Sequence, residues 1–475
     1  MRTFQQRAYL RWCGLAAAVS LLAMLARPSS AQQGSEAAAA ARFEMLRTDS
    51  ARLMEFLRAM PKGGDLHNHL SGAVRPENWA RWAAEDGLCF ITATSSIARP
   101  PCDAPDRIPA SRLLTDSVLL AKAIDAWSMR NWHPGNESGA DHFFATFDKT
   151  AAVGNAHLGQ MLAEITARAA RQNISYLELM INADSGALPR LGLAVGWTDD
   201  FAAMRKRLDS AGIRQSLSIV SQALDRAEQR ERELLRCGTP EADAGCGVTV
   251  RYIYQTIRTR RPEQVFAQIY GGFLLPSIDK RYVSFNLVGP EHNPVATRDF
   301  SLHMRMIEYL RAGHANVPLT LHAGEVSDEV APRSSRRSHI RESVEIAGAN
   351  RIGHGVDILE EDDAERVLRT MATRHIAVEI GLTSNDVILG VRGSAHPLAT
   401  YLARGVPVVL VTDDEGVSVS DMTREFFRAV TEQHLDYRAL KGIVRNSIEF
   451  SFAEDSTKAR LRAALDSAYA RFEKP

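Results

Sequence analysis

The chain has 475 residues, 45% of them hydrophobic, and Lys+Arg and Asp+Glu each number 57, so the formal net charge is zero. This composition supports a large buried core and excludes a chain too polar to fold. A balanced charge gives no overall field that would attract nucleic acid or an anionic membrane. We therefore expect no nucleic-acid partner, and no membrane partner for the mature chain.

The first 31 residues have the layout of a secretory signal peptide. Arginines precede an uncharged apolar stretch from Cys13 to Leu25, and small residues stand before a cleavage point after Ala31. A membrane anchor is the alternative, but the apolar stretch is shorter than the roughly 20 residues that a membrane-spanning helix needs. We expect residues 1–31 to be removed and the mature protein to be periplasmic or secreted.

Four cysteines remain after this cleavage, in two sequence-local pairs. An exported protein meets an oxidising compartment, and proximity favours the disulfides Cys89–Cys102 and Cys237–Cys246. Four cysteines permit three pairings, so proximity alone carries this prediction, and free buried thiols are the alternative. None of the four lies in a CxxC motif, so we do not expect zinc bound by cysteine.

Residues 32–60 precede the predicted main domain. Residues 32–42 are rich in Ala, Gln and Ser and predict a frayed leader. Between Phe43 and Met60 apolar residues recur at helical spacing, which predicts one amphipathic helix entering the fold.

From residue 61 onward, short apolar or β-branched runs alternate with longer helical patterns such as Asp199–Leu235. The alternation predicts a parallel sheet, and eight units predict an α/β fold closed into a (β/α)₈ barrel. A doubly wound open sheet is the alternative, but no GxGxxG follows an early strand. The predicted strands are Gly64–His69, Ile174–Ile181, Val248–Gln255, Tyr282–Val288, Val317–His322, Arg351–His354, Ala377–Leu382 and Val406–Thr412.

Two segments are longer than ordinary connections between strands and helices. Residues 87–140 contain Pro, Gly, Cys and Trp, and residues 225–247 contain a charged helix end and the second cysteine pair. Neither segment has the apolar residues for a core of its own. We interpret both as insertions on one domain that spans residues 61–475.

The segment Asp65-Leu-His-Asn-His69 carries the strongest local motif. Residues i and i+2 of a strand point to the same side, so His67 and His69 are expected to point together into the mouth of the barrel. Two neutral imidazoles in this arrangement form half of a zinc site. Taken alone, the motif also fits two surface histidines.

Further ionisable residues follow other predicted strands: His322 and Glu325, then His354, then Asp413 and Asp414. The carboxyl ends of the strands converge on one face of a (β/α)₈ barrel, the face where catalysis takes place. Buried ionisable groups are costly unless they are paired or bind a metal. These residues therefore predict a metal-dependent active site.

Six segments carry most of these residues in a fixed order. They are Met60–His69, His322–Glu325, Arg351–Gly355, Leu382–Asn385, His396–Leu398 and Val411–Asp414. Together they resemble the adenosine deaminase family of the amidohydrolase superfamily. The Met-Pro-Lys-Gly-Gly opening, the segment Phe143–Lys149 and the export signal resemble most the secreted, growth-factor-related branch of that family.

The resemblance implies one Zn²⁺ per chain, held by His67, His69, His322 and Asp413. The metal would lower the pKa of a bound water enough to supply hydroxide near neutral pH. His354 would orient that water and take up its proton, and Asp413 would direct the water at C6 of a purine.

The resemblance also implies a small-molecule purine nucleoside as the substrate. Glu325 would act as a protonated acid at N1, Asp414 would meet N7, and the backbone N–H of Gly289 would contact N3. A helix N-cap is the alternative role for Asp414. The implied reaction is the hydrolytic deamination of adenosine or 2′-deoxyadenosine to inosine or 2′-deoxyinosine, with release of ammonia.

One position departs from the family pattern. Many members have an aspartate two residues after the second histidine, which contacts the ribose 5′-hydroxyl, and here this position is Ser71. We assign Ser71 and His69 to substrate binding, but a neutral serine repels a 5′-phosphate or another 5′ substituent less than an aspartate does. The choice among adenosine, 2′-deoxyadenosine and 5′-modified relatives is therefore open. Adenine, AMP and N6-substituted nucleosides are further alternative substrates.

Some residues have supporting or open roles. Asn385 and His396 fit the family pattern as residues that support the site. Trp132 and His133 either line the ribose side of the pocket or pack on the surface.

Three other functions were weighed. Amidohydrolases that cleave esters or amides commonly use two metals and a carboxylated lysine after the fourth strand, and Asn286–Glu291 contains no lysine. The zinc nucleobase deaminases need His-x-Glu and Pro-Cys-x-x-Cys, which are absent from the sequence. A secreted binding module with a relic site is the non-enzymatic alternative; the sequence does not predict the oligomeric state.

Overall fold

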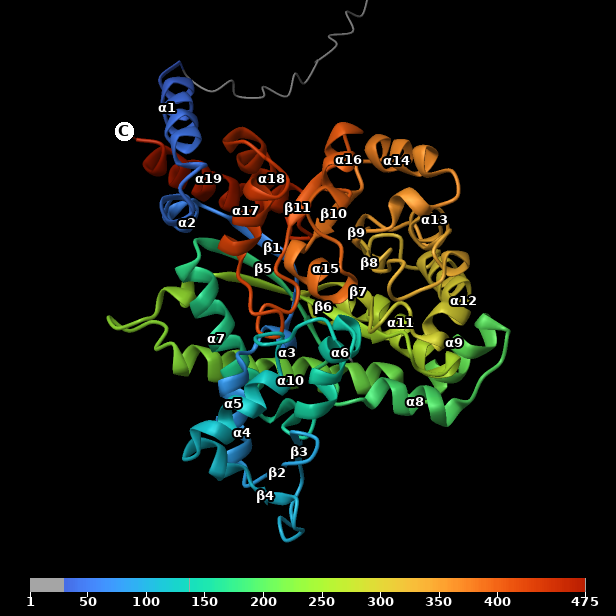
Figure 1. The fold of residues 1–475 in the computed structure, drawn as a ribbon. Coiled ribbons are helices and arrows are strands. Elements are labelled where there is room, and N and C mark those ends of the chain that lie inside the picture. The colour runs from blue at the N-terminus through green and yellow to red at the C-terminus, as the bar shows by residue number, and fades with distance from the viewer. Residues whose placement is uncertain (1–29, 136, 475) are drawn as a thin grey trace, which may run out of the picture.

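The computed structural model describes residues 30–135 and 137–474 (Figure 1). Nearly all of the predicted signal peptide therefore lies outside the described residues. Among the helices in these two ranges, none is both long and apolar enough to cross a membrane.

The first helix, α1 (Ser30–Leu46), contains the segment that was predicted as a frayed leader, so that prediction is wrong. Alanine has the highest helix propensity, and α1 is also anchored by packing. Phe43 is fully buried, with its ring centroid 6.1 Å from that of Tyr437, and Lys441 donates a hydrogen bond to Glu36 at 2.7 Å.

The predicted helix from Phe43 to Met60 is interrupted. The chain turns after α1, and α2 (Ser50–Ala59) begins at the N-cap Asp49, whose carboxylate accepts a hydrogen bond from the Arg52 N–H at 3.1 Å. An aspartate at this position satisfies a backbone donor that would otherwise be left free at the start of the helix. The capping signal was present in the sequence but was outweighed by the apolar spacing.

Eight parallel strands form two four-stranded sheets, with the strand orders β1-β5-β6-β7 and β11-β10-β9-β8 (Figure 1). All eight predicted strands are present, with ends that differ by up to three residues. The strands are β1 (Gly63–His69), β5 (Ile174–Ile181), β6 (Thr249–Ile257), β7 (Tyr282–Val288), β8 (Thr320–Ala323), β9 (Arg351–His354), β10 (Ala377–Ile380) and β11 (Val408–Leu410).

The two sheets are joined differently at their two seams. At one seam, Asp413 donates its backbone N–H to His67 O at 2.9 Å and accepts from the His69 N–H at 3.2 Å, which forms an isolated parallel bridge beyond β11. At the other, the Asn286 side chain on β7 accepts from the His322 N–H on β8 at 2.8 Å. Among the described residues no backbone ladder pairs β7 with β8, so the closed barrel predicted from the sequence is not formed by continuous pairing.

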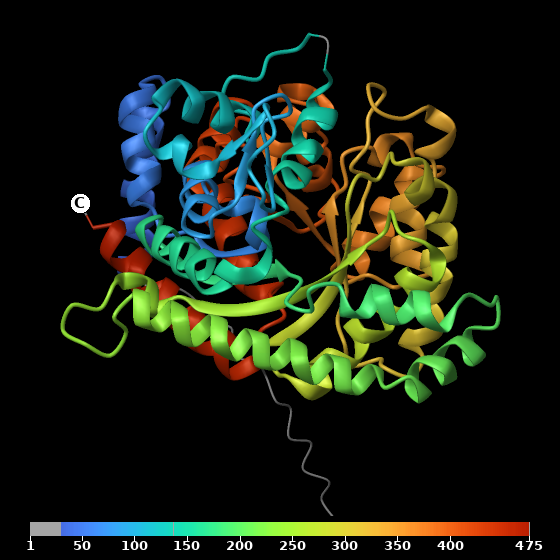
Figure 2. The same cartoon turned by 90° about the horizontal axis from the view of Figure 1, so that it is seen from below.

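Helices surround the strands, as Figure 2 shows. Strands β1 and β7 are buried along their whole length, as expected for parallel strands covered on both faces. The helices of this layer are α7 (Leu158–Arg171), α8 (Ala187–Val195), α9 (Phe201–Ser210), α10 (Ile213–Leu234), α11 (Pro262–Ile278), α12 (Pro294–Arg311), α13 (His339–Glu345), α14 (Ala364–Thr373), α15 (Leu382–Leu389), α16 (Leu398–Ala403), α17 (Met422–Thr431), α18 (Tyr437–Glu449) and α19 (Asp455–Phe472).

The predicted helical stretch Asp199–Leu235 is two helices. Gly212 separates α9 from α10 with a φ of +84°, a conformation that glycine adopts without steric cost. The second half of α10 and the loop after it make up the insertion at residues 225–247. The Cys237–Cys246 disulfide closes this loop, as predicted.

The insertion at residues 87–140 contains a small antiparallel sheet that the sequence analysis missed. Its strands are β2 (Cys89–Ile91), β3 (Ser96–Ala98) and β4 (Arg107–Pro109), in the order β3-β2-β4. The predicted Cys89–Cys102 disulfide ties it together. Buried Phe90 and Trp127 belong to the main core, so the insertion packs on it.

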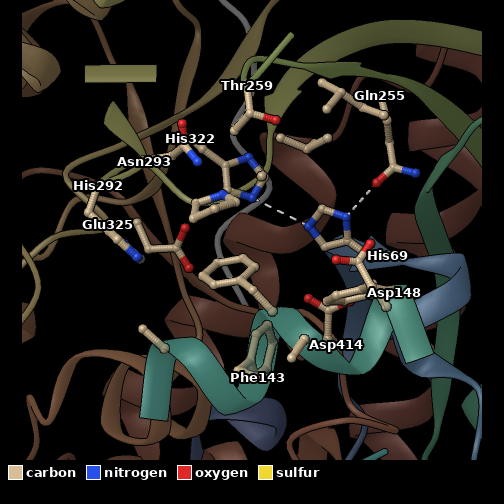
Figure 3. A pocket seen from close by; sticks show the side chains of 18 of the residues that line it. His69, Phe143, Asp148, Gln255, Thr259, His292, Asn293, His322, Glu325 and Asp414 are labelled. Carbon is tan, nitrogen blue, oxygen red and sulfur yellow. Dashed lines mark hydrogen bonds between the residues drawn. The ribbon is translucent and has the colours of Figure 1, made fainter. Parts of the chain in front are cut away.

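Four further helices lie near the carboxyl ends of the strands. They are α3 (Leu70–Ala73), α4 (Pro76–Glu85), α5 (Ser117–Ala126) and α6 (Gly139–Thr150). Helix α3 directly follows β1, and α6 lies over the functional site described next (Figure 3).

Candidate metal centre and active site

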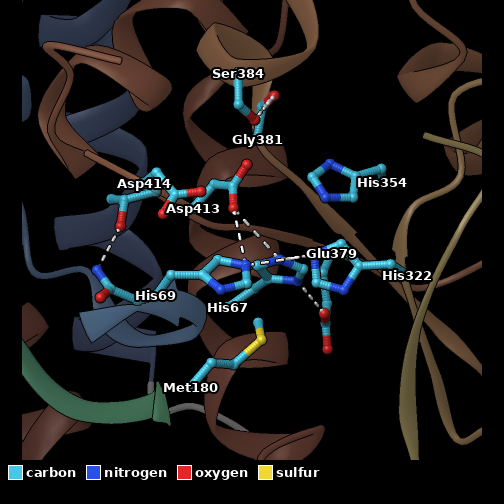
Figure 4. Close-up of polar contacts among 12 residues, drawn as sticks. His67, His69, Met180, His322, His354, Glu379, Gly381, Ser384, Asp413 and Asp414 are labelled. Atoms are coloured by element: carbon cyan, nitrogen blue, oxygen red, sulfur yellow. Dashed lines mark hydrogen bonds and ion pairs between the residues drawn. The ribbon is translucent and has the colours of Figure 1, made fainter. Parts of the chain in front are cut away.

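Four predicted metal ligands meet at the carboxyl ends of β1, β8 and β11 (Figure 4). His322 Nε2 lies 3.1 Å from His67 Nε2 and 3.3 Å from His69 Nε2. Asp413 Oδ1 lies 3.5 Å from His67 Nε2 and 3.4 Å from His69 Nε2. All four side chains are buried, although they come from positions up to 346 residues apart in the sequence.

The other ring nitrogen of each histidine faces an oxygen atom. The pairs are His67 Nδ1 with Glu379 Oε2 at 2.7 Å, His69 Nδ1 with Gln255 Oε1 at 2.8 Å, and His322 Nδ1 with Asn286 Oδ1 at 2.9 Å. In each pair the oxygen accepts and Nδ1–H donates, which leaves the lone pair of Nε2 pointing toward the other ligands. Three lone pairs and a carboxylate oxygen therefore face one another.

This donor set fits one Zn²⁺ ion. Zinc bonds of about 2.0–2.1 Å in a tetrahedron place neighbouring ligand atoms about 3.3 Å apart. The measured separations, 3.1–3.5 Å, bracket that value. Three imidazoles and one carboxylate are ligands that zinc accepts, and in the described part of the chain no cysteine joins the cluster.

The electrostatics of the cluster also favour a positive charge among the ligands. Burial lowers the pKa of His69 to about 4 and that of His322 well below its ordinary value, so both rings are neutral. Burial acts in the same direction on His67, but hydrogen bonds to Asp413 and Glu379 outweigh it and raise the pKa of that ring to about 10. The two carboxylates thus stabilise a positive charge on His67, and a divalent cation among these side chains would supply that positive charge in place of the proton.

Glu379, which the sequence analysis missed, is a fully buried carboxylate in the middle of β10. Burial alone would raise its pKa, but Arg351 and His67 lower the pKa to about 2, so Glu379 is ionised and orients His67. Arg351 also binds Glu178 on β5 at 2.6 Å and therefore connects the two sheets across the interior. A charged residue inside an otherwise apolar strand was the signal that could have revealed Glu379.

Glu325 lies at the end of β8, beside the ligand cluster. Its Oε1 is 3.5 Å from His354 Nε2 and its Oε2 is 3.8 Å from Arg258. Burial and the nearby Asp413 raise the pKa of Glu325 to about 8, although Arg258 opposes this. A pKa of about 8 favours the protonated carboxyl group at neutral pH.

A second missed carboxylate, Glu291, holds the backbone of this turn. It accepts the N–H groups of Gly324 and Glu325, both at 3.0 Å. Gly324 has a φ of +75°, and a Cβ there would lie 2.6 Å from Asp357, so only glycine fits. Glu291 thus fixes the direction in which Glu325 leaves the strand.

His354 is oriented by a chain of hydrogen bonds. The Leu398 N–H donates to His396 Nδ1 at 3.2 Å, so neutral His396 donates through Nε2 to Asn385 Oδ1 at 3.0 Å. The Asn385 amide in turn donates to His354 Nδ1 at 3.0 Å. A neutral His354 therefore carries its proton on Nε2, which faces Glu325. Asn385 and His396 support the site, as the family pattern implied.

Asp414 faces the cavity and does not cap a helix, because Asp421 is the N-cap of α17. Its Oδ1 is buried and has no hydrogen-bond partner among the described residues. Burial and the adjacent Asp413 raise the pKa of Asp414 well above its ordinary value, so it can donate a hydrogen bond. The N-cap alternative is thus wrong.

A cavity of about 930 Å³ opens onto these groups (Figure 3). Its lining includes the predicted substrate-binding residues His69, Ser71, Gly289 and Asp414, together with Glu325, His322 and Asp413. The part of the lining that was not predicted from the sequence comes from α6 and from the loops after β6 and β7, namely Phe143, Phe144, Phe147, Asp148, Thr259, His292 and Asn293.

Trp132 and His133 do not line this cavity. Trp132 packs with a small cluster that includes Phe143, and His133 is exposed. Of the two alternatives for these residues, the ribose-side one is wrong, and α6 lines the cavity instead. Aromatic residues spaced along a helix look the same in a sequence whether they face a core or a pocket.

Eight parallel strands with a buried three-histidine, one-aspartate group at their carboxyl ends define the class of metal-dependent hydrolases. Comparison with known families agrees, because the sequence model of the adenosine deaminase family matches residues 122–468, well over half of the chain. The chain belongs to the adenosine deaminase family. The match includes His322, Glu325, His354 and Asp413, whereas His67 and His69 precede it.

Individual relatives cover less of the chain. An adenosine deaminase from Salmonella typhi is 34% identical over 33% of this chain and 44% of its own length. An aminodeoxyfutalosine deaminase from Streptomyces avermitilis is 31% identical over 41% of this chain and 49% of its own length. The matches thus span about half the length of these relatives.

A solved structure supports the fold over a longer stretch. The crystal structure of an amidohydrolase from Burkholderia ambifaria with bound Zn has a TM-score of 0.58 and 18% identity. The superposition covers 88% of this chain and 93% of that one. It establishes the likeness of the folds.

The hydrogen bond from His69 to Gln255 gives a direct test of the metal centre. Gln255→Leu removes the acceptor that fixes the ring, so we expect the dissociation constant for Zn²⁺ to rise about 10–100-fold. Gln255→Glu keeps an oxygen acceptor in the same place, so its dissociation constant for Zn²⁺ should stay close to that of the parent protein. Competition with a zinc-binding dye measures both variants, and an unchanged Leu variant would contradict the assignment.

Proposed function

We propose that the protein is a zinc-dependent deaminase that converts adenosine or 2′-deoxyadenosine to inosine or 2′-deoxyinosine and ammonia. One observation carries the proposal: His69, His322 and Asp413, three members of the donor set, line the same cavity as Glu325, a carboxyl group whose pKa burial raises to about 8. A metal held by the donor set can activate a water molecule, and the acid can protonate a ring nitrogen that gains electron density.

The metal would be held by His67, His69, His322 and Asp413. When bound, zinc supplies a water whose pKa is lowered toward neutrality. His354 lies beside this group and, with its proton on Nε2, orients a water by donating to it. The resemblance also implies that His354 takes up a proton. Its free nitrogen, Nδ1, accepts a hydrogen bond from the Asn385 amide, so the Asn385–His396 hydrogen bonds would have to reorganise first.

Glu325 is the acid of the proposed reaction. Attack of a water oxygen at C6 moves electron density onto N1, and a proton from Glu325 stabilises the adduct. The C6–N bond then breaks: one proton of the attacking water passes to the 6-amino group, which leaves as ammonia, the other returns to Glu325, and the ring keeps the oxygen at C6. Arg258 and Glu291 hold Glu325 in place without reaching the substrate.

Four residues would position the nucleoside. Asp414, whose raised pKa makes it a donor, would meet N7, and the Gly289 N–H would meet N3. His69 and Ser71 would lie at the sugar end. A neutral acid at N1 and another at N7 avoid placing an unpaired carboxylate against a lone pair.

Other 6-aminopurines are alternative substrates for the same site. A second candidate reaction is the deamination of aminodeoxyfutalosine, because one relative is named as an aminodeoxyfutalosine deaminase. Adenine, AMP and N6-substituted nucleosides are further candidate substrates. A binding module with a relic site is disfavoured because every predicted ligand and the acid are present.

We also propose the cellular context and the complete architecture. Export is supported by the N-terminal pattern and by the two disulfides, which form in oxidising compartments. The Met-Pro-Lys-Gly-Gly opening supports the secreted, growth-factor-related branch. The strand order supports a (β/α)₈ barrel formed by residues 61–475, after a signal peptide at 1–31 and an N-terminal segment at 32–60.

Incubation with adenosine tests the activity. The purified mature chain, loaded with Zn²⁺, should convert adenosine and 2′-deoxyadenosine to the 6-oxopurines, which changes the ultraviolet absorbance. A chelator should abolish the conversion, and added zinc should restore it. Adenine, AMP, N6-methyladenosine and aminodeoxyfutalosine form the comparison panel; a zinc-loaded protein that acts on none of these purines would overturn the proposal.

Two carboxylate variants separate metal binding from acid catalysis. Glu325→Gln removes only the proton donor, so zinc content should stay the same while kcat falls about 10²–10⁴-fold. Asp413→Ala removes a ligand, so zinc content and kcat should fall together. Metal analysis and steady-state kinetics measure both; a metal-replete Asp413→Ala or a fully active Glu325→Gln would contradict the roles.

A further inference from the structure

A second cavity of about 350 Å³ adjoins the active-site cavity. It lies under α3 and α6 and above the carboxyl end of β5, between Trp79, Trp127 and Met161. We call this space the side chamber. The same five residues line both spaces and so form the junction between them: Ser71, Phe147, Asn182, Gln255 and Ile257.

The walls of the side chamber are mostly apolar and carry no charged side chain among the described residues. Trp79, Trp127, Leu158, Met161 and Ile181 supply large buried hydrophobic surfaces. No Asp, Glu, Lys, Arg or His belongs to the described residues that line it. The side chamber therefore favours an apolar group and disfavours a phosphate, which would lose its hydration without gaining a partner.

The junction lies at the sugar side of the proposed substrate position. Gly72, next to Ser71, packs directly on Asp414, and a Cβ at Gly72 would collide with the Asp414 carboxyl group. Asp414 is the proposed contact of N7, and N9, which carries the sugar, belongs to the same five-membered ring. In the proposed pose, a substituent that extends from the sugar would leave the active-site cavity past Ser71 and Gln255.

The small size of Ser71 keeps this route free of charge. An aspartate at the same place would put a carboxylate between the two cavities. With serine, the polar groups at the junction are one hydroxyl and two amides, from Asn182 and Gln255. These can bind the sugar while the chamber beyond them takes an apolar group.

From these contacts we infer that the preferred substrate is a 6-aminopurine nucleoside that carries an uncharged apolar group on the 5′-carbon of its sugar. The inference rests on the proposed deaminase function and names its substrate class. The 5′ group would fill the side chamber, while the purine occupies the active-site cavity.

A homologous series tests the inference. Adenosine is compared with its 5′-deoxy-5′-methylthio, ethylthio and propylthio derivatives and with AMP, using the zinc-loaded mature chain. Each methylene that is buried strengthens binding about fourfold, so kcat/KM should rise about fifteenfold from the methylthio to the propylthio compound. AMP should be at least tenfold poorer than adenosine.

Variants locate the effect in the chamber. Thr150 lines the side chamber but not the active-site cavity, so Thr150→Phe should reduce the propylthio-to-adenosine ratio of kcat/KM to about one. Ala156→Phe adds the same ring to an exposed turn that lines neither cavity and should keep the ratio. Ser71→Asp should lower the ratio about tenfold. Thermal unfolding checks that each variant is folded.

Binding gives a readout that does not need turnover. The unreactive products, inosine and 5′-deoxy-5′-propylthioinosine, are titrated into the zinc-loaded protein by calorimetry, and the second should bind at least tenfold more tightly. If adenosine reacts but kcat/KM stays constant or falls from the methylthio to the propylthio compound, the inference is wrong and the deaminase proposal stands. If no purine reacts while the propylthio product still binds more tightly, the deaminase proposal fails and the chamber assignment stands.

Discussion

The convergence of three histidine lone pairs and one carboxylate is the interaction on which the rest of the structure depends. Each Nδ1–H is held by an oxygen from a different strand: Glu379 on β10, Gln255 on β6 and Asn286 on β7. Four electron-rich atoms that all lie within 4.8 Å of one another repel unless a cation lies among them. The fold therefore stabilises an arrangement that a metal ion completes.

The same arrangement explains features that lie away from the metal site. Arg351 is buried between Glu178 and Glu379, so the ion pairs that connect the two sheets also keep the partner of His67 ionised. His354 and Asp413 have φ values of +68° and +57°, a region that non-glycine residues rarely adopt. In Asp413 this conformation lets the backbone bond to His67 while the side chain faces the ligands.

Much of this could be predicted from the sequence because it depends on local patterns. The eight strands followed from apolar runs, and His67, His69, His322 and Asp413 followed from polar residues at the ends of those runs. The two disulfides followed from proximity. The order of the motifs then identified the family, which the match over residues 122–468 supports.

The rest depends on contacts between distant segments, which no local pattern records. The helical state of residues 32–42 is stabilised by packing of Phe43 against Tyr437, about 400 residues away in the sequence. Glu379, Arg258 and Glu291 act by holding other residues in place. The small sheet of the insertion has strands of only three residues each, too short to show an alternating pattern.

X-ray absorption at the zinc edge tests the central claim most directly. In the zinc-loaded protein, the spectrum should report nitrogen and oxygen neighbours at about 2.0–2.2 Å, with the outer-shell scattering of three imidazole rings. Fewer than three imidazoles, or sulfur at about 2.3 Å, would contradict the account.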